Sequence, residues 1–156
     1  MNISQQITIN ASADKVWSIV GTDYANAKKW ATRMLDSRSG DDLGEMGGRY
    51  VNTVEYGEAT ETLYQFDNEQ RELAYTVNGN LPPVITDVTT GWRVEAEGKN
   101  QSVVTTTFGA KMLNPEMEGM IIQRLMQGLI PLLEELKYYA ENDQPHPRKQ
   151  EQLVAQ

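Results

Sequence analysis

Between residues 32 and 113 the chain repeats one pattern six times: a short run of strand-forming residues, then a polar turn. This repetition limits the possible folds more than any other feature, because such runs are typical of strands with one buried face. The runs cover roughly residues 33–39, 48–56, 59–67, 72–78, 84–97 and 102–113. The turns between them are too short for the crossovers that parallel strands need, so we predict an antiparallel meander.

One more strand and two short helices are expected before this meander. Apolar and polar residues alternate over residues 3–9, which predicts a half-buried strand. Ser12 can cap a first helix that ends at Gly21, and a second short helix fits residues 23–30.

A long amphipathic helix is predicted after the last strand, up to about Ala140. Asn114 can cap it, and Pro115 suits its first position. One face carries a stripe of leucines, namely Leu125, Leu129, Leu132 and Leu136. The order of elements predicts an α+β domain in which a curved, seven-stranded antiparallel sheet wraps around the C-terminal helix, with two short helices between the first two strands.

Gly128 and Pro131 lie inside this predicted helix, where each should weaken or bend it. Proline removes the hydrogen bond to the carbonyl of Gln127, and Gly128 allows another group to approach the backbone. Two interpretations stay open. The bend could widen a space under the helix and free a carbonyl for a ligand, or a helix laid over a twisted sheet could simply need to curve.

Composition and charge exclude several classes of function. The chain has 22 acidic and 14 basic residues, no cysteine and one histidine, giving a formal net charge of -8. This charge repels a nucleic acid backbone. Without cysteine there are no disulfides, and the single histidine lies in a polar segment, so we expect no metal and no cofactor. No apolar run is long enough to span a membrane, so we expect a cytoplasmic protein without stable membrane insertion.

The domain organisation is expected to be simple. Residues 1–142 hold every predicted element and form one domain. Residues 143–156 are polar and show little periodicity, so we expect a flexible tail. The oligomeric state is left open.

Six segments in this order resemble the START-related helix-grip superfamily. They are ITINASADKVWSIV, ETLYQFD, LAYTV, LPPV, FGAKM and GLIPLLEELKYYAE. The resemblance covers roughly residues 2–142 and is greatest to the polyketide cyclase/dehydrase and lipid-transport branch. It implies a helix-grip fold, with a cavity between the sheet and the long helix that holds a small hydrophobic or amphipathic molecule.

Glu61 is the most informative polar residue. In the helix-grip pattern, the Glu of a Glu-Arg-Leu run on this strand can face the cavity, and here the run is Glu61-Thr62-Leu63. Alternation along the strand favours the opposite facing, since Thr60, Thr62, Tyr64 and Phe66 form the more β-prone face. Both facings stay open. An inward Glu61 could donate to, or accept from, a polar group of a ligand.

The resemblance also implies which side chains lie near a ligand. Tyr75 and Val77 should line the cavity by their family position, and a buried Tyr75 needs a partner for its hydroxyl. Phe108 and Met112 stand where relatives often carry Trp-x-x-x-Phe, and they are candidates for core as well as for ligand contacts. The full set of expected ligand contacts is Trp30, Glu61, Leu63, Tyr75, Val77, Phe108, Met112, Leu125, Gly128 and Leu132.

Two functions follow from these expectations. The first is the binding or transport of a small hydrophobic or amphipathic molecule, which needs only an apolar cavity. The alternative is an enzyme of the aromatase/cyclase or dehydratase type, in which Glu61 and Tyr75 would act as acid and base on a carbonyl compound. Fold analogy does not choose between them.

Overall fold

The computed structural model describes residues 1–155, and its centre is one sheet of seven strands. The strands lie in the order β1-β7-β6-β5-β4-β3-β2, and every neighbouring pair is antiparallel. Their bounds are β1 (Asn2–Ile9), β2 (Met34–Gly40), β3 (Gly48–Thr53), β4 (Gly57–Asp67), β5 (Glu72–Gly79), β6 (Ile85–Ala96) and β7 (Ser102–Met112). The predicted sheet is therefore confirmed.

The helices before residue 143 lie where the sequence predicts, with some differences in type. Between β1 and β2 stand α1 (Ala13–Trp17), the π-helical η1 (Ser18–Thr22) and the 3-10 helix η2 (Tyr24–Lys29). After β7 come the 3-10 turn η3 (Pro115–Met117), the long α2 (Glu118–Asn142) and a third helix, α3 (Pro147–Ala155). Both predicted caps are present, because the side chains of Ser12 and Asn114 accept hydrogen bonds from the backbone of Lys15 and Glu116. No helix within residues 1–155 is long and apolar enough to cross a bilayer.

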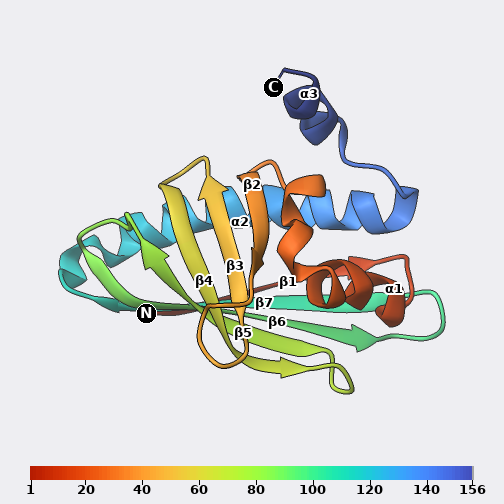
Figure 1. The fold of residues 1–156 in the computed structure, drawn as a ribbon, viewed down its shortest axis with the longest axis horizontal. Helices are drawn as coiled ribbons and strands as arrows, with labels where there is room; N and C mark the ends of the chain where they lie inside the picture. The colour runs from red at the N-terminus through yellow and green to blue at the C-terminus, as the bar shows by residue number, and fades with distance from the viewer. Residues whose placement is uncertain (156) are drawn as a thin grey trace.

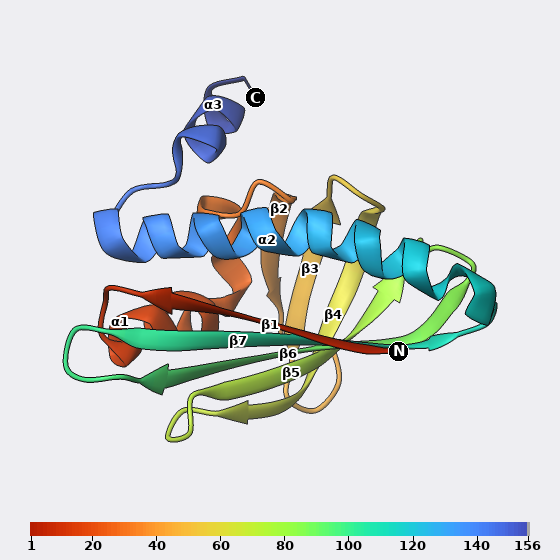
Figure 2. The ribbon, with the colours of Figure 1, turned by 180° about the vertical axis from the view of Figure 1, so that it is seen from behind.

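The strongly curved sheet holds α2 along its concave face (Figures 1 and 2). Strands β2, β3 and β4 cross the others steeply, so the sheet folds partly around the helix. The two halves of α2 differ in burial: of its first ten residues only Ile121 is buried, whereas Leu129, Leu132, Leu133, Leu136 and Ala140 are all buried. The C-terminal half of α2 thus packs as core.

A β-bulge in β4 settles which side chains of that strand face inward. Ala59 and Glu61 are buried, and the register with β5 then shifts between Leu63 and Gln65. After the extra residue, Phe66 returns to the inner face and packs on Trp17, with ring centroids 5.5 Å apart. Alternation along the strand therefore gave the wrong facing before the bulge, because one inserted residue reverses the side on which side chains lie.

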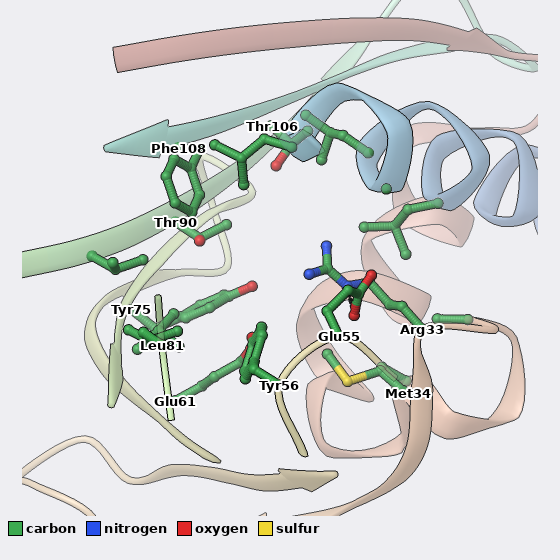
Figure 3. A pocket seen from close by; sticks show the side chains of 18 of the residues that line it. Arg33, Met34, Glu55, Tyr56, Glu61, Tyr75, Leu81, Thr90, Thr106 and Phe108 are labelled. Carbon is green, nitrogen blue, oxygen red and sulfur yellow. Dashed lines mark ion pairs between the residues drawn. The ribbon is translucent and has the colours of Figure 1, made fainter. Parts of the chain in front are cut away.

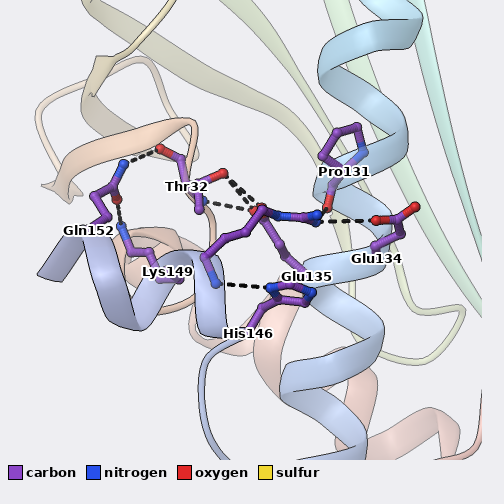
Figure 4. A network of polar contacts seen from close by, with 8 residues as sticks. Thr32, Pro131, Glu134, Glu135, His146, Lys149 and Gln152 are labelled. Carbon is purple, nitrogen blue, oxygen red and sulfur yellow. Dashed lines mark hydrogen bonds and ion pairs between the residues drawn. The ribbon is translucent and has the colours of Figure 1, made fainter.

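Within residues 143–156, which we expected to form a flexible tail, Pro147–Ala155 form α3 and pack on the domain (Figure 4). Lys149 is fully buried, and its Nζ donates to the carbonyl of Met34 at 3.0 Å. Gln152 Nε2 donates to the carbonyl of Thr32 at 2.8 Å. Periodicity did not reveal this helix because polar side chains hold it through backbone carbonyls, without an apolar stripe. Gln156 lies outside the described residues.

Candidate ligand-binding cavity

A cavity of about 780 Å³ lies between α2 and the inner face of the sheet (Figure 3). This volume falls within the range of small-molecule sites. The N-terminal half of α2 covers the cavity, which explains why few side chains of that half are packed into the core. Its apolar wall includes Ile19, Val20, Val77, Leu81, Ile85, Val88, Phe108, Ile121, Leu125, Leu129 and Leu132.

Most of the ligand contacts expected from the sequence surround this one space. Eight of the ten line it: Trp30, Glu61, Tyr75, Val77, Phe108, Leu125, Gly128 and Leu132. Leu63 and Met112 do not line it; both are partly buried and pack against the core. The ten residues therefore divide into cavity wall and supporting core.

Glu61 faces the cavity as one half of a buried ion pair. Its carboxylate accepts a short hydrogen bond from Nε of Arg49, and both side chains are at least nine-tenths buried. The two residues stand directly opposite each other in the β3–β4 register. From the sequence we expected Glu61 to be an acid without a partner. In the structure it is paired with Arg49.

The remaining donors of Arg49 are also used within the protein. Nη1 donates to the carbonyl of Tyr24 at 2.7 Å, and Nη2 donates to the hydroxyl of Tyr75 at 3.4 Å. The guanidinium also lies over the ring of Tyr24, 4.0 Å from its centroid. Arg49, Glu61, Tyr24 and Tyr75 form a closed set of contacts, which we call the polar cluster.

Burial disfavours ionisation of the two tyrosines in this cluster. Burial raises the pKa of Tyr24 far above its ordinary value, against the lowering effect of Arg49. Burial, followed by Glu61, likewise raises the pKa of Tyr75. Both hydroxyls therefore stay protonated at neutral pH, and Tyr75 has a proton to donate towards the cavity.

A second group of polar residues lies at the wall near the start of β2. Arg33 Nε stands 3.8 Å from Oε2 of Glu55, which belongs to the turn between β3 and β4. Tyr56 follows in the same turn, and burial raises its pKa. Figure 3 shows Arg33, Glu55 and Tyr56 around the same space as Tyr75 and Glu61.

Gly128 marks the point where this turn approaches α2. A Cβ atom at position 128 would lie 3.4 Å from Oε1 of Glu55. A side chain larger than alanine would push Glu55 aside or enter the cavity, which Gly128 itself lines. The helix continues through Pro131 as a single element, and Gln127, whose carbonyl loses its usual donor at Pro131, also lines the cavity.

The family described as polyketide cyclase/dehydrase and lipid transport matches residues 1–141. The chain belongs to this family. No curated protein is similar enough to count as a match.

Solved structures support the helix-grip fold of this member of the polyketide cyclase/dehydrase and lipid-transport family. A START superfamily protein from Mycobacterium smegmatis has 14% identity and a TM-score of 0.71, with 90% of this chain and 97% of that chain covered. The di-domain ARO/CYC BexL from the BE-7585A biosynthetic pathway has 16% identity and a TM-score of 0.79, covering 90% and 46%. A norcoclaurine synthase point mutant from Thalictrum flavum has 19% identity and a TM-score of 0.69, covering 92% and 95%. At these identities the likeness establishes the fold alone.

The sequence analysis of this family member did not identify Arg33, Arg49, Tyr24, Glu55 or Tyr56. A signal for Arg49 existed, since counting back from the turn at Gly57 places it opposite Glu61 in the hairpin. No comparable signal existed for Arg33. It lies in the connection between η2 and β2, and it lines the cavity only because the folded chain brings that connection there.

Proposed function

We propose that the protein binds and carries a small hydrophobic or amphipathic molecule in the cavity under the N-terminal half of α2. The observation that carries the proposal is the cavity itself, whose volume is about 780 Å³ and whose wall is mostly apolar. Apolar walls with a few placed polar groups are typical of small-molecule sites. The family's association with lipid transport agrees with this function.

The alternative, an enzyme that uses Glu61 and Tyr75 as acid and base, has less support. Proton transfer needs a group that can exchange its proton with the substrate. The Glu61 carboxylate and the Tyr75 hydroxyl both accept hydrogen bonds from the Arg49 guanidinium. A structural role in the polar cluster is therefore enough to explain both residues. The alternative predicts that Glu61→Gln abolishes turnover of a carbonyl substrate while ligand binding remains.

Binding of the neutral fluorophore 1-aminoanthracene tests the carrier function. We expect its fluorescence to rise on binding and the melting temperature to increase with its concentration, because a ligand that binds only the folded state stabilises it. Leu125→Trp, which fills the cavity, should remove both effects. Leu125 lines the cavity on α2, whereas Ile130 on the same helix is 47% exposed, so Ile130→Trp is the matched control.

Two results would contradict the proposal. If neither 1-aminoanthracene nor a series of alkanols changes the melting temperature of the wild-type protein, the cavity does not bind apolar molecules. If Leu125→Trp folds and still binds the fluorophore like Ile130→Trp, the binding site lies elsewhere.

A further inference from the structure

Two of the three arginines that line the cavity, Arg33 and Arg49, differ in how many of their nitrogen atoms donate hydrogen bonds within the protein. Arg49 donates from Nε, Nη1 and Nη2 to other residues of the polar cluster. Arg33, in contrast, has a buried Nε without a hydrogen-bond partner anywhere in residues 1–155. Its nearest carboxylate oxygen, in Glu55, is 3.8 Å away, beyond hydrogen-bonding distance.

The Arg33 guanidinium points into the cavity, beside Glu55 (Figure 3). Its side chain is 24% exposed, so it is mostly withdrawn from water, while its charge remains. Burial lowers the pKa of Arg33, but Glu55 and then Tyr56 raise it, and the net direction is upward. A largely desolvated guanidinium whose buried Nε–H has no hydrogen-bond acceptor is costly unless an anion joins it.

The charges of the cavity wall have the opposite sign to those of the whole chain. The lining includes three arginines and two glutamates and no other charged residue, namely Arg33, Arg49, Arg124, Glu55 and Glu61. The wall therefore carries a net charge of about +1 in a chain whose formal charge is -8. Because Arg49 and Glu61 neutralise each other, the excess positive charge lies around Arg33 and Arg124.

We propose that the ligand is an amphipathic carboxylic acid whose carboxylate binds the Arg33 guanidinium and whose apolar body lies between α2 and the sheet. This inference rests on the proposed carrier function and adds the chemical class of the ligand. A planar guanidinium matches a carboxylate through two parallel hydrogen bonds. A single negative charge matches the net charge of about +1 on the cavity wall.

Glu55 occupies the position that such a carboxylate would approach. It is 42% exposed and lies in the turn between β3 and β4, so it can rotate towards solvent without disturbing the sheet. Glu55 partly balances the charge of Arg33 from 3.8 Å. A bound carboxylate at hydrogen-bonding distance replaces that weaker interaction.

The test compares dansylaminoundecanoic acid with its methyl ester, which has the same apolar body and fluorophore but no charge. At neutral pH we expect the wild-type protein to bind the acid about tenfold or more tightly than the ester. In Arg33→Gln the acid should fall to the affinity of the ester, while the affinity for the ester stays unchanged. Arg93→Gln is the control, because Arg93 is 50% exposed, is outside the cavity lining and changes the net charge equally.

Each alternative result has one meaning. Equal binding of acid and ester by the wild-type protein, or an acid preference that survives Arg33→Gln, overturns the carboxylate assignment and leaves the carrier function intact. Binding of neither probe overturns the carrier function as well. Arg33→Lys keeps the charge but not the planar fork and should lose part of the preference, so the assignment remains testable if Arg33→Gln does not fold.

Discussion

At the level of single residues, Arg49 holds the polar cluster of the cavity together. It binds the carboxylate of Glu61, the carbonyl of Tyr24 and the hydroxyl of Tyr75, all from within the protein interior. A buried ion pair of this kind adds little net stability compared with apolar residues of the same shape, but removing one partner leaves a buried charge.

Arg49→Met is therefore expected to lower the free energy of unfolding by about 3–5 kcal/mol, because it leaves the buried Glu61 carboxylate without a partner. The double variant Arg49→Met/Glu61→Leu should recover most of this loss, since no unpaired charge remains. Urea unfolding of the two variants and the wild type measures both quantities. A double variant as unstable as Arg49→Met would show that the pair stabilises the fold by itself.

The buried tyrosines predict a loss of stability in alkali. Burial raises the folded-state pKa of Tyr24, Tyr56 and Tyr75 above the ordinary value of 10.0. Their contribution is fully present below pH 10 and is lost above it, where the unfolded chain releases protons that the folded chain keeps. Each tyrosine should add a slope of about 1.4 kcal/mol per pH unit.

Urea unfolding between pH 9 and 11 measures this slope. Burial lowers the pKa of Lys149, so this residue changes the pH slope of the unfolding free energy in the opposite direction over part of this range. The slopes of variants are therefore compared with that of the wild-type protein. Tyr75→Phe should reduce the slope above pH 10 by about 1.4 kcal/mol per pH unit. A slope equal to that of the wild-type protein would mean that Tyr75 ionises as freely in the folded protein as in the unfolded chain.

At the level of elements, the β3–β4 hairpin and α2 meet at Gly128. The turn of the hairpin carries Glu55 to within 3.4 Å of the position of a Cβ atom at residue 128. This distance is ordinary van der Waals contact for a methyl group, so the glycine is not required by the backbone. A larger side chain would have room only in the direction of the cavity.

Gly128→Ala is expected to raise the free energy of unfolding by about 0.5–1 kcal/mol, since alanine favours the helix. Gly128→Leu should also fold but should weaken binding of 1-aminoanthracene, because its side chain enters the cavity. Thermal unfolding and fluorescence titration of the two variants test both expectations. Destabilisation by alanine would indicate that Glu55 cannot move away from the helix.

A second element that shapes the site is α3, which contacts both α2 and the start of β2. Glu135 on α2 is 1% exposed and accepts hydrogen bonds from Thr32 and from Arg148 Nε, at 2.9 and 3.1 Å (Figure 4). Met34, whose carbonyl is bound by Lys149, lines the cavity. Helix α3 therefore supports one wall of the cavity from outside.

Arg148→Ala should lower the free energy of unfolding by about 1–3 kcal/mol, because the buried carboxylate of Glu135 loses its charged partner. Glu151→Ala, at an exposed position on the same helix, is the control and should have little effect. Urea unfolding of both variants is the measurement. Equal stabilities would imply that α3 is detached in solution.

For the molecule as a whole, the cavity lies under the half of α2 that contributes little to the packed core. The C-terminal half of the helix fills the core, while the N-terminal half spans a space lined by the sheet, η1 and η2. Pro131 lies between the two halves, and Gln127 lines the cavity one turn before it. The proposed widening of the space by Pro131 remains a prediction, which Pro131→Ala and a titration with 1-aminoanthracene would test.

The order of strands and helices could be predicted from the sequence because it depends on local patterns. Alternation, turn residues and helix caps act within a few residues of one another. The strands between Met34 and Met112, and the cap at Asn114 that begins η3 just before the long helix, could therefore be predicted from the sequence alone. The leucine stripe likewise indicated which face of the helix is buried.

Tertiary structure alone decided which polar side chains share the cavity. The bulge after Leu63 set the facing of β4, the hairpin register placed Arg49 opposite Glu61, and the path into β2 turned Arg33 towards the space. Helix α3 depended on carbonyls of Thr32 and Met34, more than a hundred residues away in the sequence. Periodicity reports how each segment divides between core and solvent, but contacts between segments depend on register and docking, which only the folded chain defines.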